Sequence, residues 1–219
     1  MALSPRTALV TGGTGRVGSA IATRLEAEGF RVRGAGSRDG DLSRAEDAHA
    51  LVERSASELG GLDLVVNAAG AGFTAKSFGD VTEEDWDAAL GATVKGSFFV
   101  TQAAVPHLRR SPLGLVVMIE DVAAYQPWPS FAPHCAAKAA QAMLTRVLAH
   151  ALAPEIRVCG IAPGPVAVAR GQERRRAGET LLGRIGEPDD VAEAVLYLVR
   201  AGFVTGTSLV VDGGRLLAR

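Results

Sequence analysis

The sequence predicts an α/β protein with one Rossmann-type, doubly wound parallel sheet that carries helices on both faces. Two observations predict this fold class. Short apolar runs alternate with longer segments of helical period along the 219 residues, and a glycine-rich turn joins the first apolar run to the first helical segment. No repeat or low-complexity linker divides the chain, so residues 1–219 are expected to form a single domain.

The first strand and the first helix are clear in the pattern. The apolar run at 7–10 predicts a strand and is followed by glycines. In the segment 17–28, Val17, Ile21 and Leu25 recur every four residues, which is the spacing of one buried helix face.

The next elements are a strand, a helix and a further strand. The strands are expected at 30–36 and 62–67, and the helix between them at 43–59. Ser43 is its predicted N-cap, because an acidic residue, Glu46, follows three positions later.

The middle of the chain predicts a long helical region followed by a buried strand. The helix opens at Thr82 and runs towards Arg110, with a break or bend near Gly91 and Gly96. The run 113–119 is apolar without alternation, which indicates a strand buried on both faces.

The last part of the chain predicts two helices and two strands in alternation. A long helix at about 131–153 ends before Pro154, and a strand follows at 156–162. A helix at 187–200 and a final strand within 207–214 complete the expected sheet.

Composition excludes several classes of protein. The net charge is -1 and gives no electrostatic reason to expect nucleic acid or an anionic membrane as partner. No apolar run approaches the roughly 20 residues that span a bilayer, and the N-terminus lacks the apolar core of a signal peptide. Cys135 and Cys159 provide neither a disulfide framework nor the spacing of metal ligands. A cytoplasmic protein without a metal is expected.

The turn TALVTGGTGRVG, residues 7–18, places four glycines between a strand and a helix. Glycines let the backbone turn tightly and approach a pyrophosphate, and the N-terminus of the helix meets its charge. The alternative is a plain glycine-rich turn without a ligand. The position between strand and helix favours a dinucleotide site.

Several further motifs occur in a fixed order. They are NAAG at 67–70, IAPGPV at 161–166, GRIGEPDDVAEAVLYL at 183–198 and TGTSLVVDGG at 205–214. With the glycine turn, these segments resemble the short-chain dehydrogenases/reductases over nearly the whole chain. Arg16 gives the fingerprint TGxxxRxG, which is similar to the pteridine reductase branch. The family usually has a further helix and strand before the DLS at 41–43, so one crossover after the second strand is expected to be trimmed.

The resemblance implies a nicotinamide dinucleotide as cofactor. The positions that match the family's cofactor site are Gly12, Thr14, Arg16, Val17, Gly18, Ser37, Arg38, Asp41, Leu42, Asn67, Ala68, Ala69, Lys138, Pro163, Gly164 and Val166.

The end of the second strand bears on the choice between NADP(H) and NAD(H). An acidic residue there favours NAD, whereas a small or basic one admits the 2′-phosphate of NADP. Ser37 and Arg38 come first at this place, and an arginine binds phosphate in a bidentate manner. Asp39 and Asp41 are the counter-evidence, although Asp41 matches the family's aspartate at the adenine ring. NADP(H) is favoured over NAD(H).

The family's catalytic residues are a serine, a tyrosine, a lysine and a supporting asparagine. Lysine alone is retained, as Lys138; Asp121 takes the serine position, His134 the tyrosine position and Thr93 the asparagine position. Asp121 is similar to the aspartate of pteridine reductases. An imidazole can act as a general acid near neutral pH, so His134 is the candidate proton donor with Asp121 as its partner. The alternative is that His134 only fills space and the site is inactive.

Substrate contacts are expected from aromatic residues near the site. Phe73 lies close to the position where pteridine reductases stack an aromatic residue on the pterin, and Trp128 is a second candidate. Tyr125 and Phe131 flank the same region, but core packing explains each aromatic equally well. Arg170 and Arg174–Arg176 occupy a loop in which a solvated lid is favoured over a site for an anionic substrate.

The resemblance therefore implies an NADP(H)-dependent oxidoreductase that transfers hydride to a carbonyl or a pterin-type C=N. The partner is a small-molecule substrate, and the protein is expected to form a homodimer or homotetramer. The rival hypothesis is a catalytically weak dinucleotide-binding protein with a sensing or assembly role.

Overall fold

A computed structural model describes residues 5–72, 74–166, 168 and 171–218. The described residues form one six-stranded sheet in the order β2-β1-β3-β4-β5-β6, with every neighbouring pair parallel. The strands are β1 Thr7–Thr11, β2 Arg31–Ala35, β3 Leu64–Asn67, β4 Leu115–Ile119, β5 Arg157–Pro163 and β6 Ser208–Val211. The helices are α1 Arg16–Ala27, α2 Ala45–Leu59, α3 Glu83–Leu90, α4 Ser97–Leu108, α5 Ala132–Leu152, α6 Glu173–Ala177 and α7 Pro188–Arg200. The predicted fold class is confirmed.

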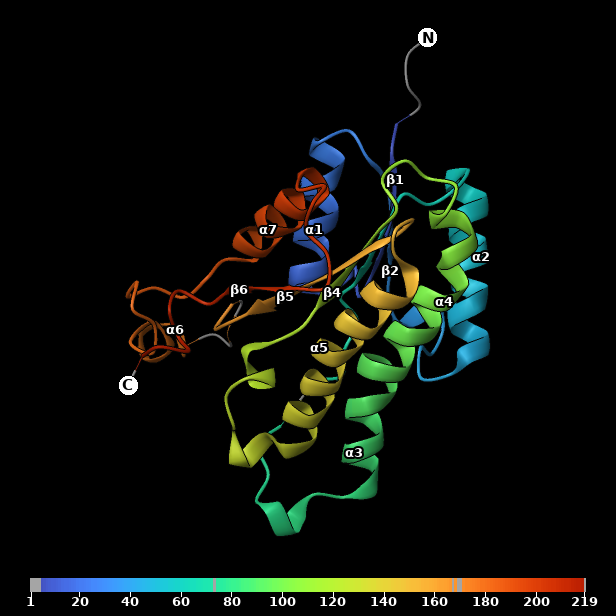
Figure 1. Cartoon of the computed structure of the whole chain (residues 1–219). Coiled ribbons are helices and arrows are strands. Elements are labelled where there is room, and N and C mark those ends of the chain that lie inside the picture. Colours follow the sequence, from blue (N-terminus) through green and yellow to red (C-terminus); the bar gives the residue numbers. More distant parts are fainter. Residues whose placement is uncertain (1–4, 73, 167, 169–170, 219) are drawn as a thin grey trace.

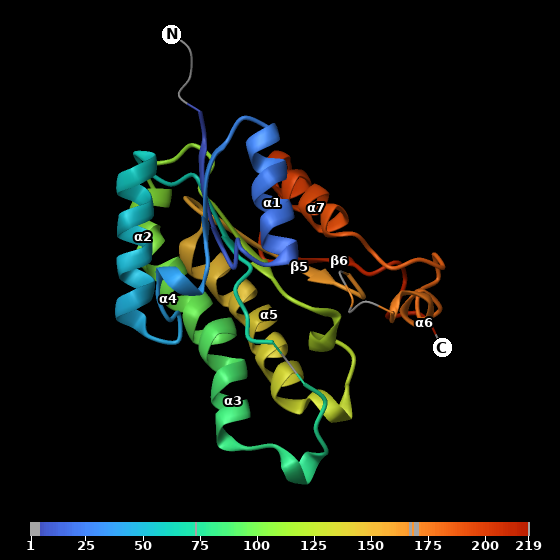
Figure 2. The same cartoon turned by 180° about the vertical axis from the view of Figure 1, so that it is seen from behind.

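Helices cover both faces of the sheet (Figures 1 and 2). α1 and α7 pack together on one face, and α2, α4 and α5 lie on the other. Successive side chains of β4 point to opposite faces of the sheet. Val117 packs in the core under α1 and α7, and Met118 packs in the core under α2 and α4. This alternation is the two-residue period of a strand, and it explains why β4 is apolar throughout.

The connection from β2 to α2 is short. It contains only a 3-10 turn, Ser37–Asp39, and β2 is the outermost strand of the sheet. The trimmed crossover is thus confirmed. The chain passes from β1 outwards to β2 and then back to β3 on the other side of β1, so the strand order reverses between β1 and β3. Open α/β sheets bind ligands at the carboxyl ends of the strands at such a point.

The break expected near Gly91 and Gly96 is confirmed. A π-helical turn, Gly91–Gly96, separates α3 from α4. Thr82 caps α3 as its sequence position suggests: its hydroxyl accepts from the Asp85 N–H at 3.3 Å, and the Thr82 N–H donates to the Asp85 carboxylate at 2.9 Å.

The predicted N-cap of the second helix is wrong. α2 begins at Ala45 with Arg44 at the N-cap, and no side chain caps it. Ser43 belongs to the preceding turn, where its N–H donates to Asp41 Oδ1 at 2.9 Å. Glu46 pairs with Arg44 and does not reach back to the cap. A local aspartate turn therefore replaces the capping box.

The end of the last strand was also predicted too far along the chain. β6 ends at Val211, because the Asp212 carboxylate accepts from the N–H groups of Gly214 at 2.7 Å and Leu216 at 2.8 Å and so closes a turn. Within the described residues, no helix is both long and apolar enough to cross a membrane.

Candidate functional site

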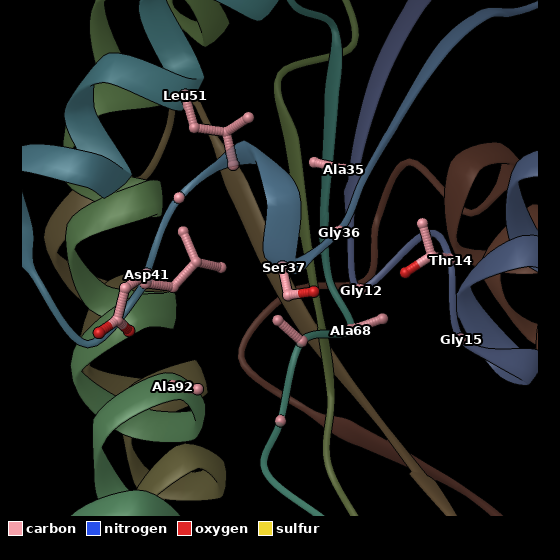
Figure 3. A pocket seen from close by; sticks show the side chains of 14 residues that line it. Gly12, Thr14, Gly15, Ala35, Gly36, Ser37, Asp41, Leu51, Ala68 and Ala92 are labelled. Carbon is pink, nitrogen blue, oxygen red and sulfur yellow. The ribbon is translucent and has the colours of Figure 1, made fainter.

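A cavity of about 470 Å³ opens at the carboxyl ends of β1, β2 and β3 (Figure 3). It lies at the point where the strand order reverses. Its lining consists of the residues Gly12, Thr14, Gly15, Ala35, Gly36, Ser37, Gly40, Asp41, Leu42, Leu51, Ala68, Ala69, Gly70 and Ala92. Seven of the predicted cofactor residues are among them, namely Gly12, Thr14, Ser37, Asp41, Leu42, Ala68 and Ala69.

The glycine turn is packed too closely for side chains. Gly12 has φ +65°, and a Cβ there would lie 2.6 Å from the carbonyl oxygen of Ala68. A Cβ on Gly18 would lie 2.2 Å from the carbonyl oxygen of Gly12. The turn delivers the chain into α1, whose first turn contains no acidic residue that would repel an anion. A cradle of this kind fits the diphosphate of a dinucleotide.

The part of the cavity wall that follows β2 contains the residues expected to contact the adenosine ribose of a dinucleotide. Ser37 lines the cavity, whereas Arg38 is exposed beside it and Asp39 is turned to the protein. Asp39 Oδ1 is 2.7 Å from Arg33, and Oδ2 accepts from the Gly36 N–H at 2.8 Å. The Asp39 carboxylate is therefore already bound within the chain.

Asp41 lines the cavity above Ala92 of the π-helical turn (Figure 3), and Leu42 is also part of the lining. Hydrogen bonds from Ser43 to the Asp41 carboxylate lower the pKa of Asp41 below its ordinary value. Asp41 is thus a fixed, ionised acceptor at the mouth of the cavity.

Other predicted cofactor residues lie beside the cavity and are not part of its lining. Arg16 is exposed at the start of α1, and its guanidinium donates to the carbonyl of Val168. Val17 packs on the core and Gly18 is buried in the turn. Asn67 donates to Thr101 Oγ1 at 3.1 Å.

The buried Oδ1 of Asn67 accepts no hydrogen bond from the described part of the chain. An open acceptor at the end of β3 is a second feature, after the glycine cradle, that suits a ligand there. Three further predicted residues lie at the end of β5 or just after it: Pro163 is its last residue, the Gly164 N–H donates to the Val211 carbonyl, and Val166 bridges to Gly186.

The structure brings the candidate acid and its partner together. His134 lies in the first turn of α5, and its Nε2 is 3.4 Å from Asp121 Oδ2. The other carboxylate oxygen of Asp121 accepts from the Ala123 N–H at 2.8 Å, which caps a 3-10 turn after β4. The indole of Trp128 is stacked on the imidazole, with ring planes at 12°. His134 is therefore oriented by a fixed carboxylate and a flat aromatic neighbour.

Lys138 lies one turn further along α5 and is buried. Its Nζ donates to the carbonyl of Ile119 at 2.8 Å and to Gln141 Oε1 at 3.0 Å. Burial lowers the pKa of Lys138 from 10.5 to about 8, and the charges of Asp121 and Glu120 act in the opposite direction. The ammonium is thus held between β4 and its own helix.

Sequence reasoning missed two buried polar residues of this region. Gln141 is fully buried; the helical spacing of three residues from Lys138 was a signal that could have found it. Glu120, at the end of β4, is 2% exposed and accepts from Thr145 at 2.6 Å and Tyr125 at 3.1 Å. No pattern in the sequence sets Glu120 apart, because its partner Thr145 lies 25 positions further along the chain.

A second cavity, of about 330 Å³, borders His134. Its walls come from the segment after β3, from α3 and from the start of α5, and include Thr93 and Phe131. Two of its lining residues, Lys76 and Asp85, form an ion pair. The predicted substrate residue Phe73 lies outside the described residues. Trp128 contacts Phe131 edge to face and does not itself line this cavity.

Two of the arginines after β5, Arg175 and Arg176, are bound to a carboxylate of their own loop. Arg175 and Arg176 pair with Glu179 at 3.1 and 2.6 Å, and Arg215 reaches the same group at 3.3 Å. Arg170 lies outside the described residues. Across the described ranges, no group of three histidine, cysteine or acidic side chains is placed to hold a metal ion.

Comparison with known proteins gives a consistent result. The sequence profile described as enoyl-(acyl carrier protein) reductase matches residues 19–215. A Streptomyces violaceoruber protein assigned as ketoacyl reductase 2 of the granaticin polyketide synthase is 37% identical over 235 residues, 94% of each chain. Human dehydrogenase/reductase SDR family member 4 is 34% identical over 97% of this chain and 88% of its own. The structure of 3-ketoacyl-(acyl-carrier-protein) reductase from Brucella melitensis, complexed with NADH, superposes with a TM-score of 0.90 at 28% identity, covering 98% of this chain and 99% of that one.

Proposed function

The chain belongs to the short-chain dehydrogenase/reductase family of oxidoreductases, and from this premise we propose that it is an NADP(H)-dependent reductase of a carbonyl or pterin-type C=N. The observation that carries the proposal is the group of Asp121, His134 and Lys138. It joins an acid, its orienting carboxylate and a buried cation at one end of α5, and a cavity borders the acid.

The glycine turn, the small residues after β3 and Lys138 would hold the dinucleotide, and the bound nicotinamide supplies the hydride. Ser37 and Arg38 support NADP(H): the wall of the cavity there presents the Ser37 hydroxyl, the exposed side chain of Arg38 lies beside it, and Asp39 is bound to Arg33. Arg16 donates two N–H groups to the Val168 carbonyl, which leaves three of its five donors for a phosphate.

His134 acts as the general acid in this proposal. Its imidazole gives a proton to the carbonyl oxygen or ring nitrogen that gains negative charge as hydride arrives. Asp121 fixes the orientation of the ring through its contact with Nε2. The indole of Trp128 lies nearly parallel to the imidazole, with the ring centroids 6.3 Å apart.

The substrate cavity favours a small, mainly apolar carbonyl compound. Val81, Ala88 and Ala89 provide apolar walls, and the charges of Lys76 and Asp85 in the lining compensate each other in an ion pair. The ketoacyl reductases among the similar proteins support a ketone substrate. The TGxxxRxG turn and Asp121, with the pteridine reductase resemblance, support a pterin.

The test separates binding from turnover. Dissociation constants for NADPH and NADH are measured by calorimetry, and NADPH oxidation is then followed with a β-ketoacyl thioester, a 3-ketosteroid, an aromatic aldehyde and a dihydropterin. Tighter binding of NADPH and turnover of a ketone or the pterin are expected. Tight binding without turnover of any member of the panel would instead favour the dinucleotide-binding protein with a sensing or assembly role.

We also propose a homodimer or homotetramer. The exposed side chains of Met143 and Val147 on α5, 53% and 51% exposed, support association through this helix. Sedimentation equilibrium gives the mass in solution; a monomer at micromolar concentration would contradict the proposal.

A further inference from the structure

Gln141 connects the buried lysine to another helix. It lies on α5 with no exposed surface, one turn after Lys138. Its Oε1 accepts from Lys138 Nζ at 3.0 Å, and its Nε2 donates to Ser97 Oγ at 3.0 Å and to the Thr93 carbonyl at 3.4 Å. The side-chain amide therefore spans the gap between the ammonium and the junction of the π-helical turn with α4.

The partners of Gln141 determine which way its amide points. An ammonium group only donates hydrogen bonds and a peptide carbonyl only accepts them. The oxygen of the amide must therefore face Lys138, and the nitrogen must face Thr93. Ser97 is in turn fixed, because its hydroxyl donates to the Thr93 carbonyl at 2.6 Å. Reversal of the amide would place donor against donor and acceptor against acceptor.

The arrangement also limits the directions in which Lys138 can donate. Of the three N–H groups of its ammonium, one binds the Ile119 carbonyl and one binds Gln141, and both acceptors are buried. The remaining N–H has its direction set by the other two. The charged groups that face Lys138 are Asp121 and Glu120 from the end of β4, with His134 on its own helix bound to Asp121.

We propose that Gln141 is the positioning residue of Lys138: its amide oxygen stabilises the buried ammonium and aims the remaining N–H at the dinucleotide. The role rests on the proposed function only for the identity of that ligand. Thr93 takes part through its backbone carbonyl, so the side chain at this position is free to differ from the family's asparagine. An amide does not ionise near neutral pH, so Gln141 holds charge in place and carries no proton.

The test measures the charge of Lys138 directly. The sequence contains three lysines, Lys76, Lys95 and Lys138, so selective labelling of lysine side chains with ¹³C gives three NMR signals, which Lys76→Arg and Lys95→Arg assign. The signals are titrated in the full chain as wild type, Gln141→Leu and Gln141→Glu. The leucine removes the acceptor and is expected to lower the pKa of Lys138 by about one pH unit; the glutamate adds charge and is expected to raise it by a similar amount.

A lowered pKa of Lys138 in Gln141→Leu together with a raised one in Gln141→Glu supports the proposal. If Gln141 were only structural, the two variants would leave the pKa of Lys138 unchanged or shift it in the same direction. If Gln141→Leu does not fold, Gln141→Glu decides alone: a raised pKa supports the positioning role, and an unchanged one overturns it. The matched control pair is Gln102→Leu and Gln102→Glu on the exposed side of α4, which should leave the Lys138 signal unchanged.

A second measurement links the residue to the ligand. Gln141→Leu is expected to raise the dissociation constant for NADPH by about tenfold, and Gln141→Glu to preserve binding better. If the pKa shifts appear and no substrate is turned over, the proposed function fails and the positioning role stands. If turnover is normal and the pKa of Lys138 is unchanged in both Gln141 variants, the positioning role is wrong and the proposed function stands.

Discussion

His134 is the residue on which the proposed chemistry depends. An imidazole is shorter than the phenol at this position in the family, but Asp121 at 3.4 Å and the stacked Trp128 hold it in one orientation. We predict that His134→Ala lowers kcat by roughly 10²- to 10⁴-fold, the usual worth of a general acid, with little change in the dissociation constant for NADPH. Steady-state kinetics with the best substrate of the panel measures this.

The control is His150→Ala, which removes an exposed imidazole from the same helix and should leave kcat unchanged. Two results together would show that His134 is not the acid: a wild-type rate in His134→Ala and a raised turnover in His134→Tyr.

The titration of Lys138 makes the free energy of unfolding depend on pH in the alkaline range. Its folded pKa of about 8 lies below its ordinary 10.5, because burial disfavours the charged form. Between these values the unfolded chain binds a proton that the folded chain has lost, so the free energy of unfolding rises with pH. One proton contributes at most about 1.4 kcal/mol per pH unit.

We therefore predict that Lys138→Met removes a rise in stability between about pH 8 and pH 10.5, as followed by urea unfolding of the protein without cofactor. Lys95→Met, on the exposed side of the π-helical turn, should retain the wild-type dependence. Parallel curves for wild type and Lys138→Met would mean that the buried group does not titrate in this window.

Thr82 and Ser43 both precede a helix, but only Thr82 caps one. Thr82 and Asp85 bind each other's backbone N–H groups at the start of α3, whereas the Ser43 N–H belongs to an aspartate turn before α2. Thr82→Ala is predicted to lower the free energy of unfolding by about 1 kcal/mol, the ordinary worth of an N-cap. Ser43→Ala is the matched comparison and should cost clearly less in the same urea titration. Equal losses would contradict the assignment of the caps.

The glycine turn is the element that the dinucleotide requires. A Cβ on Gly18 would lie 2.2 Å from the Gly12 carbonyl oxygen, so Gly18→Ala has to displace the turn from α1. We predict a loss of about 1–3 kcal/mol of stability, as for other overpacked sites, and no measurable NADPH binding by calorimetry. Gly202→Ala, whose Cβ would have open space, should bind NADPH normally. Retained binding in Gly18→Ala would show that the turn adapts.

Elements with strong local periodicity could be predicted from the sequence, and those that depend on distant partners could not. The apolar repeat of α1 and the unbroken apolar run of β4 identified both elements, since burial alone determines these patterns. The capping box at Ser43 failed because Asp41 competes for the same backbone N–H. Gln141 and Glu120 were missed because their roles depend on hydrogen bonds in the folded chain. Gln141 donates to the Thr93 carbonyl, and Glu120 accepts from Thr145 and Tyr125.

On the scale of the whole molecule, ligand binding should stabilise the fold. The cavity joins the loops after β1, β2 and β3, so a dinucleotide that binds the folded chain alone adds about 2.7 kcal/mol at a hundred times its dissociation constant. We predict a larger rise in Tm with NADPH than with NADH at equal concentration, and a reversed order in Arg38→Asp. Arg109→Asp, at an exposed arginine at the end of α4, should retain the wild-type order. An unchanged order in Arg38→Asp would remove Arg38 from phosphate recognition.

The short connection after β2 has a consequence for how the protein behaves while it folds and when it is concentrated. A bare outer strand is a template on which other chains add strands and aggregate. Two arginines of β2 oppose this: Arg31 donates to the last carbonyls of α2 at 3.1 Å, and Arg33 pairs with Glu58 at 3.0 Å. The same contacts clamp α2 over the edge. These arginine contacts are therefore expected to oppose aggregation through the outer strand.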